Sequence, residues 1–194
     1  MDMPLDLSSQ TPDEALLVLF ANGDEAAARA LTLRLTPRVM AHAFRLLGNR
    51  AEAEDVTQEA MLKLWRVAAE WRQGEAKVTT WLYRVVANLC TDRLRRSGRI
   101  AALEDAGDPV DETQSAAETM QNRSRADALQ DALTLLPERQ RQAVVLRHIE
   151  ELSNPEIADI MDLSVEAVES LIARGKRALS AELQARKDEL GYSK

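Results

Sequence analysis

The sequence predicts an all-α protein of two small helical domains, and three observations support this prediction. Only 7 of the 194 residues are Gly and 6 are Pro, and aromatic residues make up 4%, which favours helices over strands. Apolar residues recur at helical spacing along most of the chain. The basic run RLRRSGR at 93–99 gives way to residues 100–120, which hold six acids and no base, and so abrupt a change of sign predicts a boundary.

The first domain is expected to span residues 1–98. Its first two helices are separated by the turn NGD, with Asp24 as N-cap of the second helix, and Gly48 ends that helix. A third helix is expected over residues 51–66.

The loop WRQGEAKVTT at 71–80 precedes a fourth helix, which is expected to run from its N-cap Thr80 to Arg96. Residues 99–122 lack a sustained apolar period and are expected to form a flexible acidic linker. Residues 123–194 are expected to form the second helical domain.

Composition excludes several classes of protein. The net charge of −7, from 25 basic and 32 acidic residues, argues against a protein that coats nucleic acid by electrostatics alone. The sequence has no apolar run long enough to cross a membrane and no secretory signal. Its single cysteine, Cys90, excludes an internal disulfide and fits a reducing compartment. These features predict a cytoplasmic protein without membrane insertion.

The sequence has no pattern typical of a catalytic centre. His42 and His148 lie in different predicted domains, and a Gly-rich phosphate loop, an HExxH motif and a cysteine pair are all missing. The acids of residues 51–66 fit a solvated helix face far better than a metal site. We therefore expect no enzyme, no small-molecule substrate, no cofactor and no metal bound by this chain.

The helix expected at 51–66 has two usable faces when its residues are placed about 100° apart. One face is apolar and suits the core: Val56, Ala60, Leu64 and Val67. The opposite face sets a leucine and a tryptophan among polar residues: Asp55, Gln58, Glu59, Leu62, Trp65 and Arg66. A helix in a small protein needs one apolar stripe to bury, so the second face has the composition of a protein-docking surface.

Residues 152–179, LSNPEIADIMDLSVEAVESLIARGKRAL, have the pattern of a DNA-binding helix-turn-helix. Ser153 or Asn154 is the candidate N-cap, and Glu156, three residues after Ser153, fits a capping box. The residues DLS at 162–164 form a candidate tight turn, with Ser164 as the cap of the second helix. The small side chain of Ala158 lets the two helices cross closely. A helical hairpin with no DNA-binding role is the alternative that the pattern leaves open.

The outward side of the second helix of this motif mixes bases with acids. Arg174, Lys176 and Arg177 suit phosphates or guanines. Glu166 and Glu169 oppose the approach of DNA. Either Glu166 accepts a hydrogen bond from a cytosine amino group, or this face also meets a protein.

The fourth helix carries another polar stripe at i, i+3, i+7, i+11 and i+14: Trp81, Arg84, Asn88, Asp92 and Arg95. Its core side is expected to be Leu82, Val85, Val86 and Leu89. Arginines reach phosphates, asparagine pairs with base edges and tryptophan stacks on bases, whereas a merely solvated face is the alternative. The loop at 71–80 is a suitable place to hold an extruded base.

Together these segments resemble bacterial RNA polymerase sigma factors of the extracytoplasmic-function (ECF) group. ANGDEAAARAL and AHAFRLLGNRAEAEDVTQEAMLKLWR are similar to their regions 2.1 and 2.2, and WRQGEAKVTTWLYRVVANLCTDRLRR is similar to regions 2.3 and 2.4. The stretch from LPERQR to GKRAL is similar to region 4. The resemblance covers nearly the whole chain.

The resemblance implies a role for each surface. The clamp helices of the polymerase β′ subunit would be bound by Asp55, Gln58, Glu59, Leu62 and Trp65. The melted −10 element would be read by Trp81, Arg84, Asn88, Asp92, Arg95 and Arg96. The −35 element would be bound by Ser164, Glu166, Ala167, Ser170, Arg174 and Arg177, and the same domain would dock on the β flap.

The resemblance also implies regulation. Members of this group are often held inactive by an anti-sigma factor, which binds zinc in some relatives, and a stress-response regulon is expected. Acids of the linker would mimic nucleic acid if the linker threads an RNA channel of the polymerase. Glu166 and Glu169 depart from the neutral or basic residues of relatives, so the side chains that read the −35 element stay open. The Asn-Pro of SNPEIA also departs from the group and is expected to change only the helix cap.

Two other functions stay open on the residues alone. A dimeric helix-turn-helix regulator would bind a palindromic duplex without polymerase and would leave the outward face of 51–66 unexplained. A helical adaptor would bind proteins only. Transcription by core polymerase with and without this chain distinguishes the three.

Overall fold

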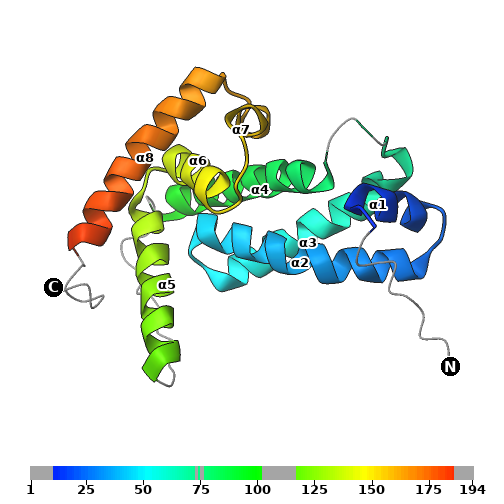
Figure 1. Cartoon of the computed structure of the whole chain (residues 1–194), viewed down its shortest axis with the longest axis horizontal. Helices are drawn as coiled ribbons and strands as arrows, with labels where there is room; N and C mark the ends of the chain where they lie inside the picture. Colours follow the sequence, from blue (N-terminus) through cyan, green and yellow to red (C-terminus); the bar gives the residue numbers. More distant parts are fainter. Residues whose placement is uncertain (1–10, 73, 75–76, 102–116, 186–194) are drawn as a thin grey trace. The chain divides into compact units, whose positions relative to one another are not determined.

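The computed structural model describes residues 11–72, 74, 77–101 and 117–185. These residues form helices and the turns between them, so the all-α prediction is confirmed. The helices are α1 (Asp13–Ala21), α2 (Glu25–Leu47), α3 (Arg50–Val67), the short 3₁₀ helix η2 (Ala68–Glu70), α4 (Val78–Ala101), α5 (Ala117–Leu135), α6 (Glu138–His148), α7 (Asn154–Met161) and α8 (Val165–Ala185) (Figure 1).

Contacts between residues divide the chain into two units. Unit 1 comprises Met1–Phe44 with Asn49–Leu89, and unit 2 comprises Arg45–Gly48 with Cys90–Lys194. The domain limits expected at 98/99 and 122/123 stay a prediction, since much of the expected linker lies outside the described residues.

Two helices extend further than their patterns predict. α4 continues to Ala101 and α5 already begins at Ala117, so both enter the expected linker 99–122, of which residues 102–116 are outside the described part. The segment AETMQN at 117–122 contains good helix formers. Helix propensity does not require an apolar period, so the missing period did not exclude a helix here. The second helical segment therefore starts earlier than residue 123.

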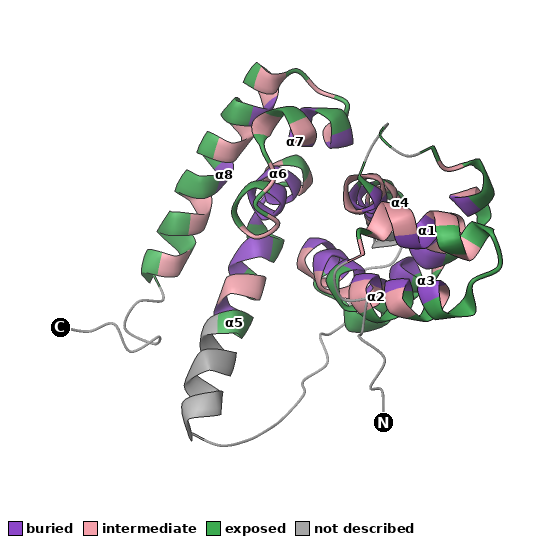
Figure 2. Ribbon diagram, turned by 45° about the vertical axis from the view of Figure 1, so that its right-hand side comes forward, coloured by how far each residue is buried: buried purple, intermediate pink, exposed green. Residues whose placement is uncertain are grey.

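The core of unit 1 is built from the inward stripes of α1 to α4 (Figure 2). α2 and α3 contribute side chains that are at most 1% exposed: Leu31, Leu35, Val39, Val56, Ala60 and Leu64. α4 buries Leu82, Tyr83, Val86 and Ala87. Val85 and Leu89, expected on this core side, are only half-buried. The buried face of α4 is thus rotated toward Tyr83, which packs its ring 4.6 Å from that of the buried His42.

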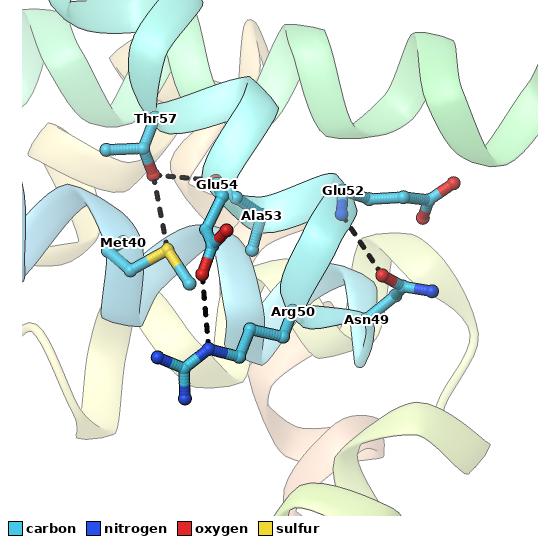
Figure 3. A network of polar contacts seen from close by, with 7 residues as sticks. All are labelled: Met40, Asn49, Arg50, Glu52, Ala53, Glu54 and Thr57. Carbon is cyan, nitrogen blue, oxygen red and sulfur yellow. Dashed lines mark hydrogen bonds and ion pairs between the residues drawn. The ribbon is translucent and has the colours of Figure 1, made fainter. Parts of the chain in front are cut away.

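Side-chain caps fix the starts of α2 and α3. Asp24 Oδ1 accepts hydrogen bonds from the backbone N–H groups of Ala26 at 2.9 Å and Ala27 at 3.1 Å, which confirms Asp24 as a cap. Asn49 Oδ1 accepts from the N–H of Glu52 at 3.1 Å at the start of α3 (Figure 3). Both helices therefore begin at positions that their own local sequence specifies.

In unit 2, α6 and α8 pack closely. α6 is buried on every side over one turn, formed by Ala143, Val144, Val145 and Leu146, each at most 2% exposed. α8 presents the buried Gly175 to Gln140 and Val144 of α6, where an added Cβ would lie 2.6 Å from Val144 Cγ2 and 3.1 Å from the Gln140 carbonyl oxygen. Glycine at this position lets the backbones approach, since close-packed interiors leave little room for an extra methyl group.

Candidate protein- and DNA-binding surfaces

The outward face of α3 presents apolar groups beside carboxylates, as its periodicity predicted. Asp55, Gln58 and Leu62 are exposed, and Leu62 keeps 53% of its surface in solvent. Glu59 is half-buried and forms an ion pair with Lys63, with 3.2 Å between Oε1 and Nζ. A single exposed leucine is ordinary, but this one lies on a rigid helix among carboxylates. Such a surface suits a partner that offers basic and apolar groups together.

Trp65 completes this face and is held in place by α1. Its ring lies edge-on to that of Phe20, with 4.7 Å between the centroids and 60° between the planes. Aromatic pairs of this geometry stabilise one another beyond simple burial, so the indole is oriented before any partner arrives. The local sequence gave no indication of Phe20, because it lies on a different helix and no short-range pattern connects it to Trp65.

The polar stripe of α4 faces outward as predicted. Its members Arg84, Asn88, Asp92 and Arg95 are exposed, as is the neighbouring Arg96, and Trp81 is half-buried at the beginning of the stripe. Three arginines can reach phosphates, and an amide can pair with base edges. The stripe therefore has the chemistry to bind a nucleic acid strand.

The start of α4 differs from the prediction. The helix begins at Val78, so the prediction that Thr80 is its N-cap is wrong. The N–H of Val78 donates to Glu14 Oε1 of α1 at 2.9 Å. The residue before the helix is Lys77, whose side chain can only donate hydrogen bonds and so cannot cap a backbone N–H group. The acceptor thus comes from a helix that is far away in the sequence, and the residues next to Val78 do not indicate it.

Two tryptophans lie together where the loop enters α4. The rings of Trp71 and Trp81 are perpendicular, with 6.1 Å between their centroids. Trp71 Nε1 is enclosed and has no hydrogen-bond acceptor among the described residues. Residues 73, 75 and 76 of the loop that was expected to hold a base lie outside the described residues, so that role stays a prediction.

α7 and α8 form the predicted helix-turn-helix. Ser153 and Glu156 make a reciprocal capping box, in which Glu156 Oε2 accepts from the N–H of Ser153 at 2.9 Å. The turn follows at Asp162, whose φ of 53° is left-handed. Ser164 Oγ then accepts from the N–H of Ala167 at 3.2 Å and caps α8. The caps and the turn that were used to predict this motif are therefore present in the structure.

The predicted −35 residues lie on the open side of α8. Ser164, Glu166, Ser170, Arg174 and Arg177 are exposed, and Ala167 is half-buried. Val168, on the other side, is fully buried. The arginines lie toward the later turns of the face and the glutamates toward its start.

Glu166 and Glu169 of α8 each have a partner within the motif. The backbone N–H of Glu166 and then the Ser164 hydroxyl donate to the Glu166 carboxylate, and they lower the pKa of Glu166 below its ordinary value. Glu169 Oε1 accepts from Asn154 Nδ2 of α7 at 3.3 Å. The Asn-Pro of α7, expected to change only a cap, therefore also links the two helices. These contacts give the acids a structural role in addition to any role toward DNA.

The described part of the chain shows no group of three His, Cys, Asp or Glu side chains that could hold a metal. None of the helices described is long and apolar enough to span a membrane.

Two family models match the chain, Sigma-70 region 2 over residues 31–100 and Sigma-70 region 4 over residues 126–179. The ECF RNA polymerase sigma factor SigE of Mycolicibacterium smegmatis is 37% identical over 182 residues, which are 91% of this chain and 70% of that protein. The chain belongs to the ECF RNA polymerase sigma factors. Such proteins bind core RNA polymerase and direct it to promoters, and the family is not one of enzymes.

Solved structures agree with this sigma-factor fold. The sigma factor RpoE of Bartonella quintana, solved with the anti-sigma factor NepR, matches with a TM-score of 0.64 and 22% identity over 79% of this chain and 94% of that chain. CnrH, solved with the cytosolic domain of CnrY, matches with a TM-score of 0.63 and 27% identity over 89% of this chain and 97% of that chain.

Proposed function

We propose that this sigma factor binds the clamp helices of the polymerase β′ subunit through the outward face of α3. The observation that carries the proposal is the exposure of Leu62, 53%, on a helix whose opposite side buries Val56, Ala60 and Leu64 completely and Val67 in part. The contacts would be made by Asp55, Gln58, Glu59, Leu62 and Trp65. Carboxylates around an apolar centre suit a partner surface with basic residues.

In the same proposal, α4 reads the melted −10 element and the helix-turn-helix binds the −35 element. The −10 contacts would come from Trp81, Arg84, Asn88, Asp92, Arg95 and Arg96. The −35 contacts would come from Ser164, Glu166, Ala167, Ser170, Arg174 and Arg177. Residues 1–98 would then serve polymerase and the −10 element, 123–194 the −35 element and the β flap, and 99–122 would be the linker.

The charge of the chain explains why polymerase is needed. A protein of net charge −7 with few arginines on each recognition helix neutralises few phosphates, so its free form should bind DNA weakly. Holding both recognition helices on one large scaffold raises the effective concentration of each for its promoter element. The linker would pass through a basic RNA channel of the polymerase, where its acids would take the place of nucleic acid phosphates.

Run-off transcription tests the proposal. Core polymerase should produce specific transcripts from fragments of the source genome only when this chain is added. Tight binding of the free chain to a palindromic duplex, with no effect on transcription, would instead support a dimeric regulator. Binding to proteins with no effect on transcription would support an adaptor.

Substitutions on α3 test the polymerase contact itself. Asp55→Ala and Gln58→Ala should each weaken binding to core polymerase about tenfold, or about 1.4 kcal/mol, with unfolding unchanged because both side chains are exposed. The matched control is Glu25→Ala. Glu25 is an exposed acid in the first turn of α2 and does not belong to the outward face of α3. Equal losses of affinity in test and control variants would show that the outward face is not the contact.

Substitutions on α4 test promoter opening. Arg84→Ala or Asn88→Ala should slow opening and leave the affinity for core polymerase unchanged, because neither lies on the α3 face. Arg38→Ala, at an exposed arginine of α2, is the control for removing one positive charge.

We further propose that an anti-sigma factor controls this protein in the cytoplasm and that its regulon responds to stress. The support is the family itself and the likeness to CnrH, which was solved with the cytosolic domain of CnrY. Any zinc in such a complex would belong to the inhibitor. An inhibitor of this kind should stop transcription when it is added before core polymerase and have little effect when added after it.

A further inference from the structure

We infer that Glu14 is a positioning residue for promoter opening, because it caps the −10 helix α4 from the separate helix α1. The inference rests on the proposed role of α4. It concerns how the first turn of α4, and with it Trp81, is held ready for a melted strand.

The N–H of Val78 needs an acceptor because it is the first amide of α4. The first amides of a helix have no partner within the helix, and Val78 is fully buried, so water does not replace a missing acceptor. A buried donor without a partner is costly. Glu14 Oε1 satisfies this amide at 2.9 Å. The first turn of α4 holds no acid of its own, so Glu14 also places a negative charge near the positive end of the helix.

α1 is a firm support for this carboxylate. Asp13, the neighbour of Glu14, forms an ion pair with Arg34 of α2 at 3.2 Å. Arg34 also donates to the carbonyl oxygen of Thr11 at 2.7 Å. Leu17 of the same helix is fully buried in the core. Glu14 is therefore fixed from α2 and from the core, and it transmits this position to Val78.

The position of Val78 affects the residues proposed to meet DNA. Trp81 lies within one turn of it, and Arg84 lies in the next turn on the same stripe. If the first turn of α4 frayed, the perpendicular packing of Trp71 on Trp81 would be lost with it. Glu14 and Val78 lie on α1 and α4, outside the face of α3 proposed to bind polymerase, so opening and core binding should respond differently. Glu14 also lies outside residues 31–100, the part that the region 2 family model matches.

The test uses the full chain assembled with core polymerase on the promoter that gives the strongest run-off product. Opening is followed by 2-aminopurine placed in the −10 element, and affinity for core polymerase is measured in parallel. Glu14→Ala should slow opening about fivefold, the factor by which losing a helix cap commonly shifts a folding equilibrium, with core affinity within about twofold. Glu14→Gln keeps an acceptor oxygen and should recover most of the rate. Glu25→Ala, at an exposed acid in the first turn of α2, should change neither quantity.

Faster hydrogen exchange at the Val78 amide in Glu14→Ala should accompany the loss of opening. Wild-type opening by Glu14→Ala would overturn the inference. So would losses of opening and of core affinity in equal proportion, because Glu14 would then only support the fold of unit 1. Arg84→Ala tests the proposed function separately. If Arg84→Ala also opens promoters at the wild-type rate, α4 does not read the −10 element, and both that role and the role of Glu14 are wrong.

Discussion

The helices proposed to read the two promoter elements begin in different ways. α8 follows a turn that its neighbouring residues specify, with a left-handed Asp162 and a cap from Ser164. α4 follows Lys77, and its first amide is satisfied by Glu14 on another helix. The helix-turn-helix is therefore defined by a short piece of chain. The start of the −10 helix depends instead on how the N-terminal part of unit 1 packs.

This difference predicts how α4 and α8 respond to substitutions elsewhere in the chain. A local cap continues to work as long as its own few residues are helical. A cap supplied by a distant residue is lost whenever the supporting helix moves, even if no residue of α4 is altered. Promoter opening should thus be sensitive to substitutions in α1 that touch neither DNA nor polymerase.

The largest expected effect comes from loosening α1. Leu17→Ala removes a fully buried side chain and should lower the free energy of unfolding of unit 1 by about 2–5 kcal/mol. All three tryptophans, Trp65, Trp71 and Trp81, belong to unit 1, so their fluorescence during urea unfolding reports on that unit. The same variant should slow promoter opening more than Glu14→Ala, because it releases the whole support of the cap.

Leu33→Ala is the matched control for this substitution. Leu33 is on α2 and is 72% exposed, so its truncation should change the unfolding free energy by less than about 0.5 kcal/mol. Equal destabilisation by the two variants would mean that α1 is not anchored through Leu17.

A smaller effect is expected from the local cap of the helix-turn-helix. Ser153→Ala should destabilise unit 2 by about 1 kcal/mol, because the N–H of Glu156 loses its acceptor. Glu156→Ala should have a similar effect, and the double variant should cost less than the sum, because the two side chains form one reciprocal cap. Thermal unfolding followed by far-UV circular dichroism measures these differences. Ser180→Ala, at an exposed serine of α8, is the control and should leave the transition unchanged. If the losses from Ser153→Ala and Glu156→Ala simply add in the double variant, the two side chains act independently.

The same contrast explains what could be predicted from the sequence. The helix-turn-helix could be predicted closely, since Ser153, Glu156 and Ser164 act on amides three positions away, and only the choice between Ser153 and Asn154 as the cap was left open. The two faces of α3 followed from periodicity alone. Thr80 was the wrong cap and Phe20 was missed, because Glu14 and Phe20 reach their partners through tertiary packing that short-range patterns do not encode. The link between Asn154 and Glu169 was missed for the same reason: it joins two helices across a turn.

The smallest expected effect concerns the titration of Glu166. The backbone N–H of Glu166, and then the Ser164 hydroxyl, lower the pKa of this carboxyl below its ordinary value. The folded state therefore binds the proton less readily than the unfolded chain does. The resulting contribution to stability is present above the ordinary pKa and is lost as the pH falls through the folded-state pKa.

Ser164→Ala should raise the pKa of Glu166 only part of the way to its ordinary value, because the backbone N–H makes the larger contribution and stays in place. Titration of the Glu166 carboxyl carbon by NMR, with Ser180→Ala as the control, measures this shift. An unchanged pKa would show that the hydroxyl serves only the N–H of Ala167, to which it is bonded at 3.2 Å. A partial rise would show that the start of α8 holds its own glutamate by short-range contacts, as it holds its own cap. Unlike the start of α4, it would then need no distant residue to present its first turn to DNA.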